Sequence, residues 1–399
     1  MRCLYIAARA PLSPHYRGGS SAIYYEQLAS LHDLGHEVHL WHFAYEKERQ
    51  SYDAFVAGDA AVWAEVQAMC ASITITTLPQ RPNLWQKVQD RLANRLSGQD
   101  AIFPLLRTVA HAEFKRLLRQ TRPDFIFAQH LWPAQVAVLQ KEVPVIFSHH
   151  DWLFRIKALR SRQAESEAMR QMEERVARQA AAVTSGSAVE CQQLRDIGCA
   201  NVAYIPVAYK PADLDFDTLP DEPRLVHFGG LATTATRVGL ERFAALVWPH
   251  IRPKPLFYAV GDISSAALSP TLPQFLSEVV CTGHVTDWPT VLRPYDLHLI
   301  PWEHSTGQRT RLPVAFNFGQ VVVAARPGIA GYPEAQDGLN CRLVDRLEEM
   351  APVISELLAD PAQRLRLGRA ARETFMDSFT RPGLLPRYQT LIERVTRSS

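Results

Sequence analysis

Short apolar runs alternate with stretches of helical periodicity along most of the 399-residue chain. Apolar runs of this length predict buried strands, and the amphipathic stretches between them predict helices such as 21–34, 86–96, 107–119 and 160–180. This alternation is typical of parallel α/β layers. In the first half, the strands are expected at residues 3–8, 37–43, 72–77, 125–129, 143–148, 182–185 and 202–205.

The same pattern starts again after residues 210–223, a segment rich in proline and aspartate that predicts a linker. Residues 224–230 form an apolar run that ends in two glycines, and a helix is expected at 238–251. The chain also opens with an apolar run, Gly18 and Gly19, and a helical stretch. The sequence therefore predicts an α/β fold of two doubly wound, Rossmann-like domains that face each other across a ligand-binding cleft.

Composition narrows the class of protein. The net charge of +2 is too balanced to indicate a nucleic-acid partner, so none is expected. The six cysteines are scattered without metal-type spacing, and the chain has no GxGxxG, so neither a metal nor a dinucleotide cofactor is expected. No apolar run approaches the roughly 20 residues that span a bilayer. We expect a cytoplasmic protein.

The most informative segment is 301–324, which predicts a strand end, a polar loop, a short helix and a buried strand. Arg309 and Arg311 lie where the loop becomes the helix. Free N–H groups at a helix start and forked guanidinium donors both favour phosphate oxygens. The alternative is a surface loop that is merely capped by arginine.

A second polar group follows the strand at 143–148. His149, His150 and Asp151 come at its carboxyl end, where ligands of doubly wound sheets bind. His150 suits a base near neutral pH, and Asp151 could orient it or accept a proton. Either histidine could instead satisfy a buried carbonyl. His130 ends another strand and is assigned to the same side.

Five segments resemble, in order, those of the GT-B fold glycosyltransferases, and within them the group 1 retaining family. GGSS with LGHEVHL is similar to the family's opening loop, helix and second strand. FGGL with GLERF resembles the start of its donor-binding domain, and CTGHV with YD resembles the part that flanks the nucleotide base. The order is completed by two further segments, RLPVAFNFGQVVV and the stretch from Gly331 through Glu334 to Val344.

The resemblance implies an acceptor-binding domain over residues 1–207, a linker over 208–223 and a nucleotide-sugar donor domain over 224–378, with a helix at 379–399 crossing back to the first domain. The implied reaction moves a sugar from a nucleotide diphosphate sugar to an acceptor hydroxyl with retention. His150, Asp151 and Arg311 are the implied catalytic residues. The donor-binding residues are Arg309, Arg311, Gly229, Gly230, Arg237, Gly283, Val285, Glu303 and Glu334, and the acceptor-side residues are Gly18, Gly19, His130 and His149.

Departures from the family keep alternatives open. Its two donor-site glutamates would fall at Thr306 and Val314, so neither is present. We therefore retain an inverting enzyme with Asp151 or His150 as base, a sugar-nucleotide 2-epimerase, and a sugar-nucleotide-binding protein without catalysis.

The acceptor is left open as a saccharide, a lipid-linked saccharide or a small molecule. The basic amphipathic stretch 83–96, which contains Trp85, leaves open a peripheral contact with the inner face of a membrane. A helix packed on the core with a solvated basic side is the alternative.

Overall fold

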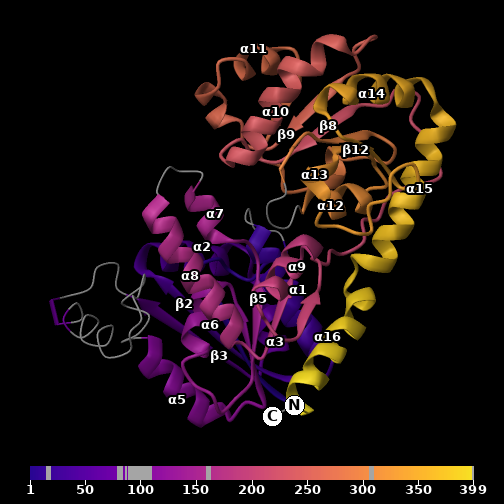
Figure 1. Cartoon of the computed structure of the whole chain (residues 1–399). Helices are drawn as coiled ribbons and strands as arrows, with labels where there is room; N and C mark the ends of the chain where they lie inside the picture. The colour runs from indigo at the N-terminus through magenta and orange to yellow at the C-terminus, as the bar shows by residue number, and fades with distance from the viewer. Residues whose placement is uncertain are drawn as a thin grey trace. The chain divides into compact units, whose positions relative to one another are not determined.

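The computed structural model describes residues 1–14, 19–78, 84–85, 88, 110–158, 163–304 and 310–397. The helix expected at 86–96 lies outside these residues, except for Val88. By their contacts the residues form two compact units (Figure 1). Unit 1 comprises Met1–Gly186, Glu190–Pro206 and the stretch from Leu384 onward, and unit 2 comprises Ser187–Val189 and Val207–Gly383.

Unit 1 is built on a parallel sheet with the strand order β3-β2-β1-β4-β5-β6-β7 in its described part. The order reverses between β1 and β4, which makes their carboxyl ends the switch point where doubly wound folds bind ligands. The strands are β1 (Arg2–Ala8), β2 (Glu37–Tyr45), β3 (Ser72–Leu78), β4 (Phe125–Gln129), β5 (Val145–His149), β6 (Ala182–Ser185) and β7 (Val202–Tyr204).

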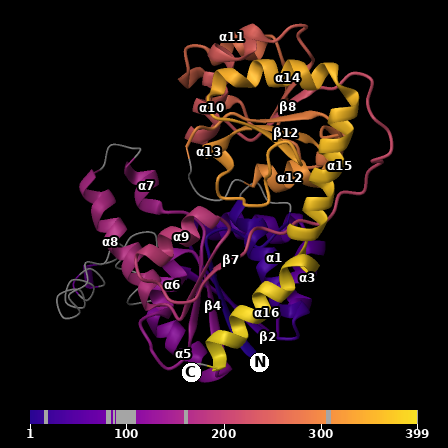
Figure 2. The same ribbon diagram turned by 45° about the vertical axis from the view of Figure 1, so that its right-hand side comes forward.

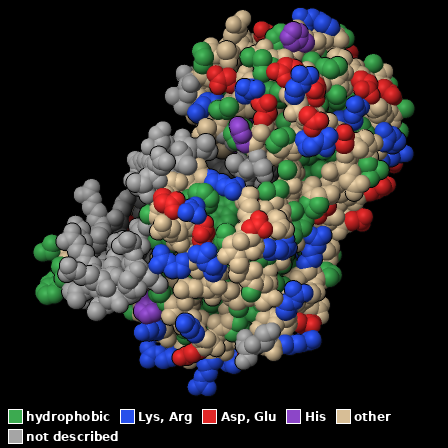
Figure 3. Space-filling view, in the orientation of Figure 1, with side chains coloured by type: hydrophobic (Ala, Val, Ile, Leu, Met, Phe, Trp, Pro, Cys, Tyr) green, Lys and Arg blue, Asp and Glu red, His purple; other side chains and the backbone are tan. Residues whose placement is uncertain are grey.

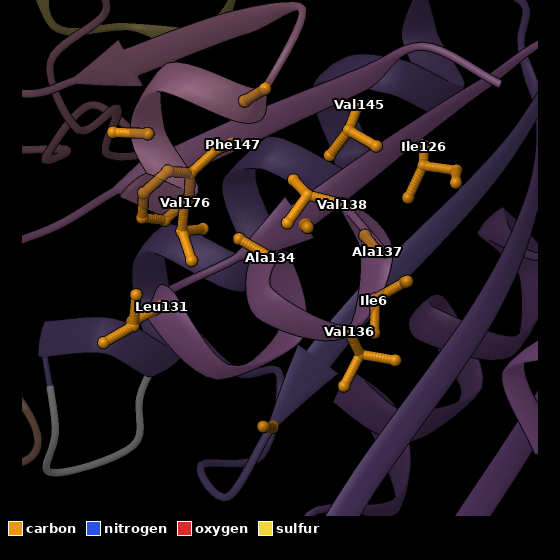
Figure 4. Packing of buried hydrophobic residues seen from close by; sticks show 14 of the residues in the cluster. Ile6, Ile126, Leu131, Ala134, Val136, Ala137, Val138, Val145, Phe147 and Val176 are labelled. Atoms are coloured by element: carbon orange, nitrogen blue, oxygen red, sulfur yellow. The ribbon is translucent and has the colours of Figure 1, made fainter. Parts of the chain in front are cut away.

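Helices cover both faces of this sheet. On one face, Ile6 and Phe147 of the sheet pack with Val136 of α6 and Val176 of α8 (Figure 4). The strands are buried on both sides because they carry apolar residues without strict alternation. The described helices of unit 1 are α1 (Gly19–Asp33), α2 (Glu46–Gly58), α3 (Ala60–Met69), α5 (His111–Thr121), α6 (Leu131–Ala137), α7 (Leu153–Ala158), α8 (Gln163–Gln179) and α9 (Ala188–Asp196).

The last helix, α16 (Arg381–Arg397), packs on unit 1 from Leu384 onward (Figure 2). Its Tyr388 ring lies 6.3 Å from the ring of Phe127 in β4. Arg387 donates to the carbonyl of Tyr204 at the end of β7, at 3.4 Å. The C-terminal helix is thus held by strands that precede unit 2 in the sequence.

Unit 2 repeats the architecture with a parallel sheet in the order β10-β9-β8-β11-β12-β13. Its switch point lies between β8 and β11. The strands are β8 (Leu225–Phe228), β9 (Phe257–Val260), β10 (Val280–Gly283), β11 (Leu297–Ile300), β12 (Val321–Ala325) and β13 (Cys341–Val344). The helices of its described part are α10 (Thr234–Leu246), α11 (Leu272–Ser277), α12 (Arg311–Asn317), α13 (Arg326–Ile329), α14 (Met350–Ala359) and α15 (Pro361–Ser378). The expected fold class, two doubly wound α/β domains, is confirmed.

Candidate functional site

Each unit carries a polar cluster at its switch point. In unit 1, His130 directly follows β4 and its N–H donates to the carbonyl of Ser148 in β5, at 3.0 Å. His130 has a φ of 70°, a conformation that non-glycine residues rarely adopt, and it turns the chain sharply out of the strand. The rings of His130 and His150 stack with their centroids 4.6 Å apart. These two predicted site residues therefore lie side by side.

Hydrogen bonds fix which nitrogen of His150 carries the proton. The Gln129 amide nitrogen donates to the Tyr5 hydroxyl (2.7 Å) and to Gln27, so its oxygen must accept. That oxygen lies 2.9 Å from Nε2 of His150, which is therefore the protonated nitrogen of the neutral ring. Nδ1 is buried without a hydrogen-bond partner and carries a free lone pair.

The ring of His150 is a weak base. Burial, together with the nearby His130 and His149, lowers its pKa well below the ordinary value. Burial, His149 and Arg9 lower the pKa of His130 to about 4. Both rings are therefore neutral near pH 7. A neutral imidazole with a free lone pair is suited to accept a hydrogen bond from a ligand hydroxyl, and less suited to take a proton from it.

His149 lies in a different environment, although it is the next residue along the chain. Its ring is 3% exposed, and Nδ1 lies 3.5 Å from the Glu190 carboxylate of α9. Burial opposes its charged form, but Glu190, with Glu173 and Asp151, outweighs burial and raises the pKa of His149. His149 is thus an interior partner of carboxylates.

Glu173 holds the segment that contains the predicted catalytic residues. Its two carboxylate oxygens accept from the N–H groups of Leu153 and Phe154, at 2.8 and 2.9 Å, where α7 begins. Burial raises the pKa of Glu173 to about 7 in spite of these donors. In the sequence, the half-buried Asp151 lies between His150 and the N–H groups that Glu173 binds.

In unit 2, the predicted glycines shape the turn after β8. Gly229 has a φ of 130°, and its N–H donates to Val260 of β9 at 2.8 Å. The guanidinium of Arg311 lies against its α-carbon: a β-carbon built there would be 2.8 Å from Nη2 and 3.1 Å from Cζ. The absence of a side chain thus lets Arg311 cross the turn. Gly230 follows and lies beside Asp262.

Two buried side chains hold the guanidinium of Arg311. Nη1 lies 3.3 Å from Nε2 of His227 in β8, and Nη2 donates to the hydroxyl of Thr236 in α10. His227 and Thr236 are each 1% exposed. Burial, the charge of Arg311 and the nearby His298 lower the pKa of His227 well below its ordinary value. The ring is therefore neutral and does not repel the cation.

The other predicted donor-side residues surround this turn in part. Nη1 of Arg237 donates to the carbonyl of Leu231, at 3.5 Å. The carbonyl of Gly283, which has a φ of 68°, accepts from the N–H of Gly261 at 2.9 Å. Val285 packs against an apolar cluster that includes Val226 and Val260. These residues thus support the loops at the carboxyl ends of β8, β9 and β10.

Glu303 and Glu334 have partners of their own. Glu303 follows β11 and forms an ion pair with Arg242 of α10. Glu334 is half-buried, and its carbonyl accepts from the side chain of Asn340 at 2.8 Å. Neither contact assigns them to a ligand, so both assignments stay predictions.

Several expected site residues cannot be placed. Arg309, Thr306 and Gly18 lie outside the described residues, while Gly19 is the first residue of α1.

Val314, where the family has a glutamate, is 1% exposed and packs in an apolar cluster with Phe318 and neighbours. In the described part of the chain, no group of three His, Cys, Asp or Glu side chains could hold a metal ion.

Three of the side chains that orient the predicted ones were not expected from the sequence: Glu173, His227 and Thr236. A signal exists for His227, which interrupts an apolar strand two residues before the glycine turn. No sequence pattern identifies Thr236, because it lies 75 residues from Arg311 along the chain and contacts it only in the folded structure.

Each of the two parallel sheets of Rossmann type thus carries a polar cluster at its switch point, where doubly wound folds bind their ligands. Residues 18–208 match the family described as glycosyl transferase 4-like domain. A sequence comparison with curated proteins gave no match. The match lies almost entirely within unit 1, and the two-unit architecture is the GT-B fold of solved glycosyltransferases.

Solved structures share the fold over the whole chain at low sequence identity. HepE of Anabaena in complex with UDP-glucose is 16% identical, with 100% of both chains covered and a TM-score of 0.65. Sucrose-phosphate synthase of Thermosynechococcus elongatus is 15% identical, with the same coverage and a TM-score of 0.69. A TarM variant of S. aureus in complex with fondaparinux, alpha-GlcNAc-glycerol and UDP is 11% identical, covering 98% of this chain and 100% of that one, with a TM-score of 0.69.

Proposed function

We propose that this protein is a glycosyltransferase that moves a sugar from a nucleotide diphosphate sugar to an acceptor hydroxyl with retention of configuration. The observation that carries the proposal is the guanidinium of Arg311, held over the glycine turn at the switch point of unit 2. Structures of similar fold contain UDP or UDP-glucose, so a uridine nucleotide is the first donor to test.

Arg311 binds the diphosphate and stabilises the charge that it gains as the sugar departs. A fixed cation at a developing negative charge lowers a barrier by several kcal/mol, on the order of 3. Arg309 is a second proposed phosphate ligand. The glycine turn, Arg237, Gly283 and Val285 shape the nucleotide side, and Glu303 and Glu334 are proposed to bind the sugar or ribose. The proposal requires no metal ion, because the guanidinium supplies the positive charge.

On unit 1, Nδ1 of His150 accepts a hydrogen bond from a sugar hydroxyl, since its lone pair is free and the ring is neutral. The departing phosphate takes the acceptor proton on the same face of the sugar. Asp151 is proposed as a further polar contact on this unit. Gly18, Gly19 and His130 are assigned to the acceptor side, which His149 supports from the interior through Glu190. The low pKa of His150 makes it a poor base for the inverting alternative, which would then depend on Asp151.

Binding is tested by a thermal-shift screen of nucleotide diphosphate sugars, because a ligand that binds only the native state raises its melting temperature. Arg311→Ala should abolish the shift given by the right donor. Arg346→Ala, at a side chain that is 75% exposed in the same unit, is the matched control and should keep it. A full shift with Arg311→Ala would reject the phosphate assignment.

The reaction is tested with the donor found in that screen. The anomer of the first-formed product, followed by NMR, separates retention from inversion. Release of nucleoside diphosphate without any acceptor, with a 2-epimeric sugar as product, would support the epimerase. Donor binding without turnover on any acceptor would support the non-catalytic alternative.

The acceptor is a saccharide, free or lipid-linked, and the enzyme works in the cytoplasm with a peripheral contact at the inner face of the membrane. All six cysteines are free, as is usual in a reducing compartment. Lys and Arg side chains gather at the end of unit 1 where α5 lies, among them the exposed Lys115, Arg119 and Arg122 (Figure 3). Leu84 and Trp85 are 78% and 76% exposed.

In the described residues, no helix has the length and hydrophobicity to cross a membrane. Co-sedimentation of the full chain with phosphatidylglycerol vesicles, but not with neutral phosphatidylcholine vesicles, is the expected result for a peripheral contact. No co-sedimentation with either would refute it.

A further inference from the structure

Three residues that are distant from Arg311 in the sequence contact its guanidinium. His227 comes from β8, 84 residues earlier, and Thr236 from α10, 75 residues earlier. The third contact is the bare α-carbon of Gly229. An arginine on the surface moves among many rotamers, whereas contacts on these sides restrict its orientation.

The contact with His227 defines the state of that ring. A guanidinium has no acceptor, so Nη1 donates and Nε2 of His227 accepts at 3.3 Å. The proton of the neutral ring is therefore on Nδ1. His227 is 1% exposed and its pKa is lowered by burial first and by Arg311 second, so the acceptor is present throughout the neutral range.

The contact with Thr236 uses a hydroxyl that is 1% exposed. Nη2 of Arg311 donates to this oxygen, so the other side of the fork is held as well. Thr236 lies in the first turn of α10, which follows the glycine turn directly. The turn and both hydrogen-bond acceptors thus belong to one continuous segment, 227–236, against which the guanidinium rests.

We propose that His227 and Thr236 are positioning residues for the Arg311 guanidinium, and that this fixed orientation selects nucleoside diphosphates over monophosphates. The inference rests on the proposed function, since it assumes that Arg311 binds the second phosphate. His227 and Thr236 act through Arg311. They restrict the orientation of its guanidinium, so that less side-chain freedom is lost when the ligand binds.

The test measures dissociation constants of UDP and UMP by calorimetry, with GDP/GMP and ADP/AMP as the next pairs if uridine nucleotides do not bind. Thr236→Val removes the hydroxyl at almost constant shape, and Thr236→Ser keeps it. His227→Leu removes the acceptor, and His227→Gln places an amide oxygen near the position of Nε2. We expect Thr236→Val and His227→Leu to weaken diphosphate binding roughly tenfold, as for a lost hydrogen bond to a charged group, with monophosphate binding unchanged.

Thr236→Ser and His227→Gln should restore most of the diphosphate affinity. In an Arg311→Ala background, Thr236→Val should cause no further loss, because residues that act through one another are not additive. Equal losses for the diphosphate and the monophosphate, or an additive loss in that background, would overturn the positioning role. Circular dichroism spectra and melting temperatures identify any variant that fails to fold. If a variant at position 227 or 236 does not fold, the test is made with the variants at the other of these two positions.

The outcomes separate the two proposals. If Arg311→Ala leaves diphosphate binding unchanged, the phosphate assignment fails and the inference falls with it. If Arg311→Ala weakens diphosphate binding but Thr236→Val and His227→Leu do not, the proposed function stands and the positioning role is wrong.

Discussion

Lowering the pH should destabilise unit 2 through His298, which lies behind the Arg311 cluster in β11. Its side chain is fully buried, with 0% exposed. Nδ1 lies 2.8 Å from the oxygen of Gln320, whose amide nitrogen donates to the carbonyl of Arg293 at 3.3 Å. Nδ1 of His298 therefore carries the proton, and Nε2 is buried without a hydrogen-bond partner. If Nε2 of His298 were protonated, its N–H group would find no hydrogen-bond acceptor among the described residues.

Burial first, and the charge of Arg311 as a further cause, lower the pKa of His298 to about 4, although the bond to Gln320 acts in the opposite direction. In the unfolded chain the ring titrates near 6.5. The unfolded state thus binds a proton that the native state does not, so stability is full above pH 6.5 and is lost as the pH falls towards 4. Between pH 7 and pH 5 the loss from this one ring is about 2 kcal/mol.

The assay is urea unfolding at pH 7, 6 and 5, applied to the native sequence and to His298→Asn. Asparagine places an amide donor near the position of Nδ1 but does not titrate. The variant should therefore lose about 2 kcal/mol less between pH 7 and pH 5 than the native sequence. His250→Asn, at an exposed position in the same unit, should parallel the native sequence. If the curves of His298→Asn and the native protein run parallel, the burial argument is wrong.

Two further substitutions test how the elements of unit 2 are packed. Gly239→Ala would place a β-carbon of α10 2.8 Å from the carbonyl oxygen of Pro301. We therefore expect the free energy of unfolding in urea to fall by about 1–3 kcal/mol. Gly58→Ala is the control and should lower it far less, because a β-carbon there would have nothing within 4 Å. Val314→Glu restores a family glutamate at a side chain that is 1% exposed, so several kcal/mol should be lost, on the order of 3 or more, without tighter donor binding. A stable Val314→Glu variant with higher donor affinity would show that this position faces the ligand.

The fold was largely predictable from the sequence, because buried parallel strands leave a direct apolar signal. The strands expected at 125–129 and 182–185 match β4 and β6. Helices α2, α3 and α15 were not predicted. Helix α15 carries arginines and glycine among its apolar residues, and its register becomes clear only once Leu367, Ala371 and Phe375 are seen to pack inward.

The candidate site was predictable only in part. Residues that stand at strand ends, such as His130, His150 and Gly229, could be selected because the topology of a doubly wound sheet places such positions at the switch point. Their partners could not, because contacts between segments have no local pattern. The opposite environments of His149 and His150 illustrate this limit: adjacent residues in a strand point to opposite faces, and only packing decides which one meets Glu190 and which one meets Gln129.

The missing family glutamate has a physical explanation in the same terms. Arg311 and Val314 are three residues apart in α12, yet one reaches the glycine turn and the other packs among Val226, Val260 and Phe318. A carboxylate at 314 would have to be buried in that cluster, which costs more than a surface ion pair with an arginine could return. Val314 therefore anchors helix α12 to the sheet through apolar packing, while the guanidinium of Arg311 is contacted by His227 and Thr236. Donor recognition in this chain should accordingly depend on neutral hydrogen-bond acceptors behind Arg311 rather than on a carboxylate beside it.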